Sequence, residues 1–191
     1  MDKREYIKAS IKIKSEILQD NKLLEQIDKC SNLIINAFES GKKLLSAGNG
    51  GSAADAQHFA GELVSKFNII RTGLPAIALT TDSSILTAIS NDLGYENIFA
   101  KQIEAIGAEG DVFIAISTSG TSPNIVTALK KAKEKGLKTI LLTGLSEELE
   151  ETNCNITLKV PSTCVPLIQE SHIMIEHIIC ATVEEKLFKS N

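Results

Sequence analysis

Few residues in this sequence break or bend regular structure, since it has 12 glycines and 4 prolines among 191 residues. Collagen-like and low-complexity chains contain far more of both, and no internal repeat is evident, so fibrous, disordered and repeat-array proteins are excluded. Hydrophobic residues make up 43% and charged residues 23% of the chain. This composition and length predict a single domain over residues 1–191, large enough to bury a core without disulfide bonds or a structural metal.

Long apolar runs and an excess of positive charge are also lacking. Residues 1–6 are charged and no apolar stretch approaches the ~20 residues that span a bilayer, so we expect no membrane association and a cytoplasmic location. Lysine and arginine total 20 against 24 acidic residues, a net charge of −4, which disfavours binding along nucleic acid. Small anionic ligands are not excluded, because backbone N–H groups and helix N-termini can hold them.

The cysteines are few and irregularly spaced. None of the four forms a C-x-x-C pair: Cys30, Cys154, Cys164 and Cys180. We expect reduced thiols that are mostly buried as small hydrophobic side chains.

Hydrophobic patterning divides the chain into a helical leading segment and an alternating part. Residues 2–40 are helix-forming, and Gly41 ends them. Five short apolar runs then predict strands at 43–47, 76–81, 111–118, 138–143 and 156–160. Helical patterns between and after them cover 52–67, 84–106, 122–135, a short segment at 146–151, and 165–188.

Apolar strands that alternate with helices predict βαβ units and a parallel sheet covered on both faces. We therefore predict a doubly wound α/β fold with five parallel strands over residues 41–191. The leading segment 1–40 carries more apolar surface than one sheet face needs, so it is predicted to serve in homo-oligomerisation, the alternative being that it covers only its own domain. Ligands of such sheets bind beyond the carboxyl ends of the strands, where loops lead into helices.

The first loop of this kind, residues 48–53, reads Gly-Asn-Gly-Gly-Ser-Ala. Its small residues would let a ligand approach the main chain, and Ser52 could cap the following helix. The same residues match the G-x-G-x-x-A dinucleotide fingerprint, with Asp82 as a conceivable ribose partner. A plain tight turn is the alternative.

The second loop, residues 117–123, reads Ser-Thr-Ser-Gly-Thr-Ser-Pro. Its five hydroxyl side chains and its backbone N–H groups predict a nest for the oxygens of a phosphate. Because it has no lysine or arginine, the anion would be held by hydrogen bonds and the helix dipole, each dipole contact contributing about 0.3–1 kcal/mol. Such a nest suits a terminal phosphate monoester better than a pyrophosphate, although a helix cap without a ligand would have the same composition.

Histidines and carboxylates on two predicted helices are further candidates. His58 and Glu62 are four residues apart and share one helix face, where they could bind a metal, divide acid and base roles, or simply hydrogen-bond each other. Polar residues also interrupt the apolar final helix: Gln169, Glu170, His172, Glu176 and His177. Buried polar groups need partners, and spacing alone does not decide which of these meet or whether they are only satisfied core residues.

Five motifs are similar to those of a known family. They are Ala-Gly-Asn-Gly-Gly-Ser at 47–52, Asp-Ala-Gln-His-Phe-Ala-Gly-Glu-Leu at 55–63, Ile-Ser-Thr-Ser-Gly at 116–120, Ile-Gln-Glu-Ser-His at 168–172, and His177. As a set, and over effectively the whole chain, they resemble the phosphoheptose isomerases of the sugar-isomerase (SIS) superfamily. The resemblance implies a SIS, flavodoxin-like fold and a cytoplasmic, zinc-dependent homotetramer. It also implies conversion of D-sedoheptulose 7-phosphate into D-glycero-D-manno-heptose 7-phosphate, the first step of nucleotide-activated heptose biosynthesis for lipopolysaccharide or capsule.

The resemblance also implies roles for individual residues. One zinc ion per subunit would be held by His58, Glu62, Gln169 and His177. In an enediol-type proton transfer Glu62 would be the base and His177 the acid. Besides Glu62 and Gln169, the implied substrate contacts are Asn49, Gly50, Gly51, Asn91, Asp92, Ser117, Thr118, Ser119 and Ser122. No redox or nucleotide cofactor is needed, because an aldose and its ketose are close in energy.

Two other functions remain to be weighed. A non-catalytic phosphosugar-binding module, like the DnaA initiator-associating protein, would need the loops but not Glu62 and His177, and the presence of both favours the enzyme. A Rossmann-type dehydrogenase built on Gly48, Gly50 and Ala53 is disfavoured by the hydroxyl-rich second loop. Leu167 departs from the pattern, because many relatives have arginine there.

Overall fold

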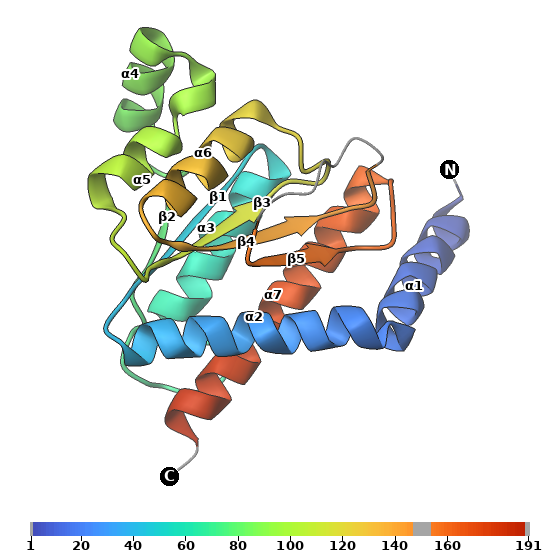
Figure 1. The fold of residues 1–191 in the computed structure, drawn as a ribbon. Coiled ribbons are helices and arrows are strands. Elements are labelled where there is room, and N and C mark those ends of the chain that lie inside the picture. Colours follow the sequence, from blue (N-terminus) through green and yellow to red (C-terminus); the bar gives the residue numbers. More distant parts are fainter. Residues whose placement is uncertain (1, 147–153, 190–191) are drawn as a thin grey trace.

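Five parallel strands form one sheet in the computed structural model, which describes residues 2–146 and 154–189 (Figure 1). The strands are β1 (Leu44–Gly48), β2 (Ala76–Ala78), β3 (Val112–Ile116), β4 (Lys138–Thr143) and β5 (Ile156–Lys159), in the spatial order β2-β1-β3-β4-β5. The helices are α1 (Lys3–Gln19), α2 (Asn21–Glu39), α3 (Gly51–Val64), α4 (Ser83–Leu93), the short 3₁₀ helix η1 (Tyr95–Asn97), α5 (Ala100–Ile106), α6 (Pro123–Glu134) and α7 (Val165–Phe188). The predicted doubly wound fold with five parallel strands is confirmed.

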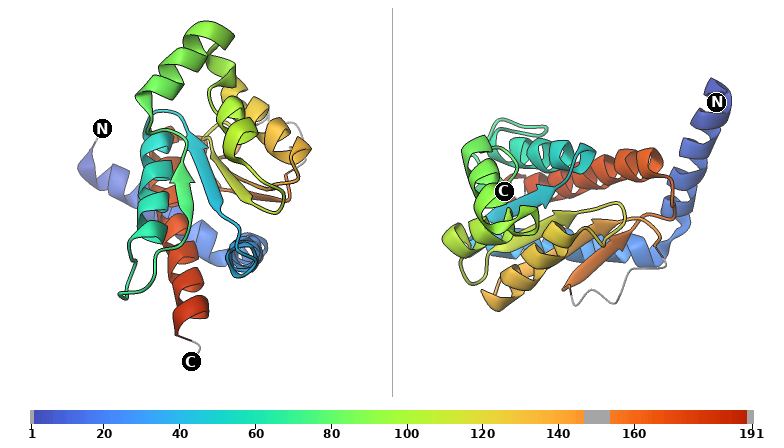
Figure 2. Two further views of the ribbon diagram at one scale, coloured as in Figure 1. Left: turned by 90° about the vertical axis from the view of Figure 1, so that its left-hand side faces the viewer. Right: turned by 90° about the horizontal axis from the view of Figure 1, so that it is seen from above.

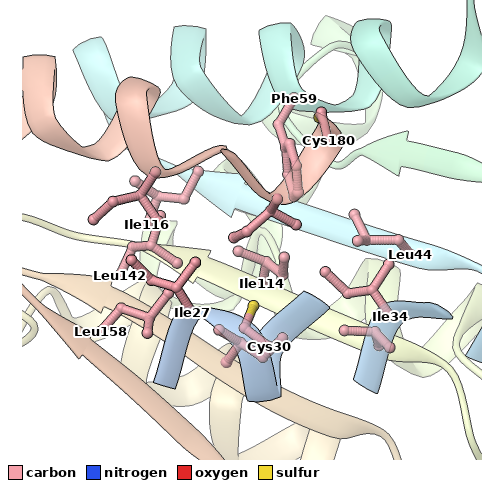
Figure 3. Close-up of a cluster of buried hydrophobic side chains, with 14 of the residues drawn as sticks. Ile27, Cys30, Ile34, Leu44, Phe59, Ile114, Ile116, Leu142, Leu158 and Cys180 are labelled. Atoms are coloured by element: carbon pink, nitrogen blue, oxygen red, sulfur yellow. The ribbon is translucent and has the colours of Figure 1, made fainter. Parts of the chain in front are cut away.

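Both faces of the sheet are covered by helices. Successive residues of β3 point to opposite faces, so Ile114 and Ile116 enter one hydrophobic cluster and Phe113 enters the other. The first cluster packs against α2, α3 and α7, and Figure 3 shows Ile27 and Phe59 approaching the sheet within it. The second cluster contains residues of α5 and α6. Each strand of a fully covered parallel sheet is thereby apolar on both sides, which is why the strands read as continuous apolar runs.

Two predicted helices are each divided by a local signal. Residues 2–40 form α1 and α2, because the Asp20 carboxylate accepts a hydrogen bond from the N–H of Leu23 and so caps a new helix. Residues 84–106 form α4, η1 and α5, because Gly94 adopts a φ of 91° that a continuing helix cannot contain. The predicted helix at 146–151 lies outside the described residues apart from Ser146.

The leading helix α1 stands off the body of the molecule (Figure 2) and buries only Ile17. Its side chains Ile7, Ile11 and Leu18 are exposed. It contacts the start of α7 through Glu170, which accepts hydrogen bonds from Ser10 and Lys14.

The predicted cysteine chemistry is borne out in part. No disulfide joins the four cysteines, all of which lie in the described part of the chain, but only Cys30 and Cys180 are buried, whereas Cys164 is exposed. Within residues 2–146 and 154–189, no helix is both long and apolar enough to cross a membrane.

Candidate active site

The first and second loops lie side by side at the point where the strand order reverses. Strand β1 has β2 on one side and β3 on the other, so the loops that follow β1 and β3 lead to helices on opposite faces of the sheet. Asn49 in the first loop joins the two: its Nδ2 donates to Oδ1 of Asn124 at 2.9 Å, and Asn124 Nδ2 donates back to Asn49 Oδ1 at 2.8 Å. The reciprocal amide pair fixes the spacing between both loops.

Glycines allow the first loop to turn sharply into α3. Gly50 precedes the helix with a φ of 55°, and a Cβ on Gly48 would lie 2.3 Å from the main-chain oxygen of Ser52. The expectation that Ser52 caps α3 is wrong, because Gly50 occupies the N-cap position and no side chain caps the helix. Asp82 caps α4 through the N–H of Ile85, so the dinucleotide interpretation loses its ribose partner.

The second loop folds its hydroxyl groups toward one another. Ser117 Oγ accepts a hydrogen bond from the N–H of Gly120 and lies 3.2 Å from Ser122 Oγ, while Ser119 Oγ accepts from the N–H of Thr121. Ser122 precedes α6 but its hydroxyl caps no helix N–H group. The main-chain oxygen of Thr118 accepts a hydrogen bond from the N–H of Gly144, the residue that follows β4. This bond links the second loop to the carboxyl end of β4. The loop thus presents hydroxyl groups at a helix N-terminus, but its own serines already accept from the N–H groups of Gly120 and Thr121, which a bound phosphate would have to take over.

Three of the predicted functional side chains meet between α3 and α7, which lie side by side in Figures 1 and 2. His58 Nε2 is 2.7 Å from His177 Nε2 and 3.6 Å from Glu62 Oε1. The His58 side chain is 37% exposed and that of Glu62 25% exposed, so solvent and small molecules reach both. We call His58, Glu62 and His177 the His–Glu cluster.

Gln169 lies at another place along the same two helices. A Cβ on Gly51 would be 2.4 Å from its Nε2, which shows that the Gln169 side chain covers the start of α3. Eight residues of helix, a rise of about 12 Å, separate Gln169 from His177 on α7. Among the described residues, no hydrogen bond joins Gln169 to the His–Glu cluster.

The structure does not bring Asn91 and Asp92 into either loop. Both are exposed on α4, where Asn91 Nδ2 donates to Asp92 Oδ1 at 2.7 Å, and no residue of α4 is buried. The nearest link is Tyr95, just beyond α4, whose hydroxyl donates to Asn49 Oδ1 at 3.0 Å. Tyr95 and Asn124 were not among the predicted site residues. Only the position of Asn124, directly after the second loop, could have marked one of these two residues as a site residue from the sequence.

Buried polar side chains lie beside the His–Glu cluster. Asp55, His172 and Glu176 hold buried side-chain atoms without hydrogen-bond partners. Burial, reinforced by the neighbouring Asp55 carboxylate, raises the pKa of Glu176 to about 9. Burial also raises the pKa of Asp55 to about 6, against the effect of His58, and lowers that of His172 to about 4, against the effect of the Thr143 main chain.

The His–Glu cluster has the donor chemistry of a zinc site. Imidazole nitrogen and carboxylate oxygen are ordinary zinc ligands, and two imidazoles with one carboxylate form a known catalytic set. As the side chains are placed, however, no group of three or more His, Cys, Asp or Glu in the described part of the chain could hold a metal ion. The two imidazoles are at hydrogen-bond distance from each other, so metal binding would require the rings to move apart.

The strand order and the paired loops define the class as a doubly wound α/β protein with a candidate ligand site at the topological switch point. A family model described as SIS domain matches residues 5–144. Phosphoheptose isomerase from Aneurinibacillus thermoaerophilus is 54% identical over 187 residues, covering 98% of this chain and 94% of the relative. Phosphoheptose isomerase 2 from Campylobacter jejuni is 56% identical, covering 96% and 93%. The chain belongs to the phosphoheptose isomerase family of SIS-domain enzymes.

Solved structures agree with that assignment. The phosphoheptose isomerase from Francisella tularensis superimposes with a TM-score of 0.90 at 39% identity, covering 95% of this chain and 96% of the other. The enzyme from Neisseria gonorrhoeae gives 0.86 at the same identity and coverage. The leading helices, the sheet and the final helix are therefore arranged in this chain as in the two solved structures.

Proposed function

We propose that this enzyme interconverts D-sedoheptulose 7-phosphate and D-glycero-D-manno-heptose 7-phosphate, with Glu62 as the base and His177 as the acid. The observation that carries the proposal is the meeting of Glu62 and His177, from separate helices, around His58. Isomerisation of an aldose to a ketose moves a proton between adjacent carbons and needs both roles within reach of those carbons.

The second loop is proposed to bind the phosphate. His58 lies seven residues beyond Gly51, which the helical rise places about 10 Å from the loop end of α3. With C–C bonds of about 1.5 Å, an extended seven-carbon chain and its phosphate ester span about 10 Å as well. A substrate held by its phosphate beside Asn49 could thus present its reacting carbons to the His–Glu cluster, and the remote anion would supply binding energy for orientation.

Within the His–Glu cluster, Glu62 would accept the proton from one carbon of the open-chain sugar and return it to the neighbour. His177 would deliver a proton to the carbonyl oxygen on which negative charge develops, and would take back the proton of the neighbouring hydroxyl as that oxygen becomes the new carbonyl. As the side chains are placed, His58 lies at hydrogen-bond distance from His177 and would hold that ring in orientation, and binding of a metal ion to both rings would replace this contact. Reversible transfer of this kind leaves no net change in redox state.

We further propose that His58, Glu62, Gln169 and His177 bind one zinc ion per subunit. Zinc at this place would supply Lewis-acid stabilisation of the two sugar oxygens. The donor types of the His–Glu cluster support this, and Gln169 would have to approach from the loop end of α7. Metal analysis after mild purification should find about one zinc per subunit, and a metal-free preparation with full activity would contradict the proposal.

A cytoplasmic homotetramer that supplies heptose for lipopolysaccharide or capsule completes the proposal. The exposed apolar side chains of α1 support an oligomer, because they have no partner within the described part of the chain. A negative net charge and the hydroxyl-lined second loop favour a small phosphosugar over nucleic acid as the partner.

The first prediction tests the base. Glu62→Gln keeps the shape of the side chain but removes the carboxylate, so turnover of sedoheptulose 7-phosphate to an aldoheptose phosphate should fall by about 100- to 10,000-fold, the usual contribution of a general base. Binding of the substrate, measured by calorimetry, should persist. Glu134→Gln, at the exposed far end of α6, is the matched control and should retain full activity.

Two outcomes would change the conclusion. If the unaltered protein binds sedoheptulose 7-phosphate but converts none of it, the chain is a non-catalytic phosphosugar-binding module. If Glu62→Gln loses binding and turnover equally, the residue contributes to structure or ground-state binding and is not the base.

A further inference from the structure

The segment between α3 and β2 is held down by one buried carboxylate of α7. Glu184 Oε1 accepts hydrogen bonds from the main-chain N–H groups of Asn68 and Ile69 at 2.7 and 3.0 Å. Its Oε2 accepts from the N–H of Phe67 at 3.0 Å and from Nε of Arg71 at 3.1 Å. These donors outweigh the cost of burial and hold the pKa of Glu184 below its usual value, so the carboxylate is ionised at neutral pH.

Arg71 connects the same segment to the end of α3. Its side chain is 2% exposed, as is that of Glu184. Nη1 donates to the carbonyl of Leu63 at 2.7 Å and Nη2 to the carbonyl of Glu62 at 2.9 Å. The last carbonyls of a helix have no partner within it, so the guanidinium caps the final turn of α3, the turn that carries Glu62.

The segment also reaches His177. The ring of Phe67, whose N–H is held by Glu184, lies 5.5 Å from the His177 ring between centroids, with an interplanar angle of 43°. One ion pair therefore contacts the main chain of the proposed base directly and the ring of the proposed acid through one intervening residue.

Three contacts join α3 and the segment after it to α7, in the same order along both. Gly51 meets Gln169, His58 meets His177, and the segment that includes Phe67 meets Glu184. The two helices thus run in the same direction, and the His–Glu cluster lies between a contact at the substrate loops and a buried ion pair.

We propose that Arg71 and Glu184 are positioning residues for the isomerisation, which fix the separation of Glu62 and His177. The proposal rests on the proposed function of Glu62 and His177. A displacement of about 1 Å at reacting groups can cost about a hundredfold in rate, so a device that sets this separation matters beyond its contribution to stability.

Two full-length variants test the proposal. Arg71→Lys keeps the charge beside Glu184 but replaces a rigid fork by one flexible ammonium, which cannot serve Glu62, Leu63 and Glu184 together. Glu184→Gln places an amide N–H against main-chain N–H groups that need an acceptor. We expect kcat to fall by about 10–100-fold in each, with KM changing by less than about threefold, because neither residue contacts the first or second loop.

Asp111→Asn is the matched control. The Asp111 side chain is 2% exposed and accepts from the N–H groups of Lys43 and Ala108 and from the Lys43 ammonium, at the amino ends of β1 and β3 and away from the His–Glu cluster. Its amide variant should lower the melting temperature about as much as Glu184→Gln while leaving kcat unchanged in the folded protein. Equal losses of kcat in Asp111→Asn and Glu184→Gln, or a kcat within twofold of the unaltered protein in folded Arg71→Lys, would overturn the proposal.

A second readout separates this proposal from the proposed function. The chain has three histidines, so their ring resonances can be followed by nuclear magnetic resonance without substrate. Arg71→Lys should shift the ring signals of His58 and His177, whereas Asp111→Asn should not. If the unaltered protein has no isomerase activity, the proposed function fails, and unmoved ring signals in Arg71→Lys would then refute the positioning role separately.

Discussion

At the scale of residues, three buried ionisable side chains lie where the chemistry is proposed. Glu176 and His172 are fully buried on α7, and Asp55 approaches them from α3. Burial keeps Glu176 and His172 neutral at neutral pH, whereas Asp55, with a pKa of about 6 and His58 nearby, is mostly ionised there. Ionisation of Glu176 or His172 would place an uncompensated charge between the helices. Stability should therefore depend on pH in a way set by these groups.

The Glu176 prediction concerns that pH dependence. Its pKa is about 9 in the folded protein and near 4.5 when unfolded, so the folded state binds the extra proton and loses stability as pH rises through this interval. His172 has a pKa of about 4 in the folded protein and an ordinary pKa of 6.5, so its contribution to stability rises with pH between these values. Asp55 lowers stability with rising pH only between 3.8 and about 6. The free energy of unfolding should thus fall by about 1–3 kcal/mol from pH 6.5 to 9.

Glu176→Gln tests the assignment, because the amide cannot ionise. Chemical denaturation at several pH values should show a flatter profile above pH 6.5 and a gain in stability at pH 8. An unchanged slope in Glu176→Gln would mean that another group causes the loss.

Local residue patterns predicted part of the site and could not have predicted the rest. The composition of the two loops and the spacing of His58 and Glu62 are patterns within a few neighbouring residues. The sequence alone therefore identified the loops and this pair as candidates. The contact between His58 and His177 joins residues 119 positions apart, and it was expected from family resemblance and not from spacing. Glu184 was not among the predicted site residues, because its partners lie 113 to 117 positions earlier in the chain and no local pattern marks it.

At the scale of elements, the parallel pair α3 and α7 forms the platform of the site. The apolar runs predicted all five strands, since a covered parallel strand is apolar on both faces, but the run at 76–81 continues three residues past the end of β2 and that at 111–118 two residues past the end of β3. Helix boundaries were harder to predict from hydrophobic periodicity. Asp20 begins a new helix by capping it, and Gly94 ends one by adopting a positive φ, and neither effect changes the pattern of apolar residues. The start of α3 is defined by two glycines with different neighbours, Gly48 against main chain and Gly51 against a side chain.

Gly51→Ala and Gly48→Ala should therefore have different effects. The new Cβ at position 51 meets only the flexible end of Gln169, which can move, so we expect a melting temperature within about 3 °C of the unaltered protein and a KM raised several-fold by the displaced amide. At position 48 the new Cβ meets the main chain of Ser52, and overpacking should lower the melting temperature by about 3–10 °C. Thermal unfolding and steady-state kinetics distinguish the two, and a KM unchanged in Gly51→Ala would remove Gln169 from the substrate site.

At the scale of the whole molecule, α1 is the element whose apolar side chains the rest of the described chain leaves largely uncovered. It buries one residue, yet Ile7, Ile11 and Leu18 share a face, with exposed fractions of 57%, 58% and 72%. Exposed apolar side chains gathered on one helix are typical of a surface that another subunit covers.

The proposed oligomer predicts the behaviour of α1 variants. Ile11→Glu combined with Leu18→Glu should shift the protein to a smaller species in light scattering after size-exclusion chromatography, because charges would be buried in the interface. Lys8→Glu, which changes an exposed charge on the same helix, should leave the mass unchanged. The same mass for the double variant and the unaltered protein would exclude this face from the assembly.

The order of the strands also has a consequence for biosynthesis. Strand β1, which lies between β2 and β3, pairs with β3 in a register that matches Leu44 to Val112, residues 68 positions apart. During translation β1 leaves the ribosome long before the strand that covers its second edge, and contacts this distant in sequence form slowly. A nascent chain arrested before residue 112 should accordingly expose the apolar side chains and one unpaired edge of β1. Such a chain should depend on chaperones until β3 has been synthesised.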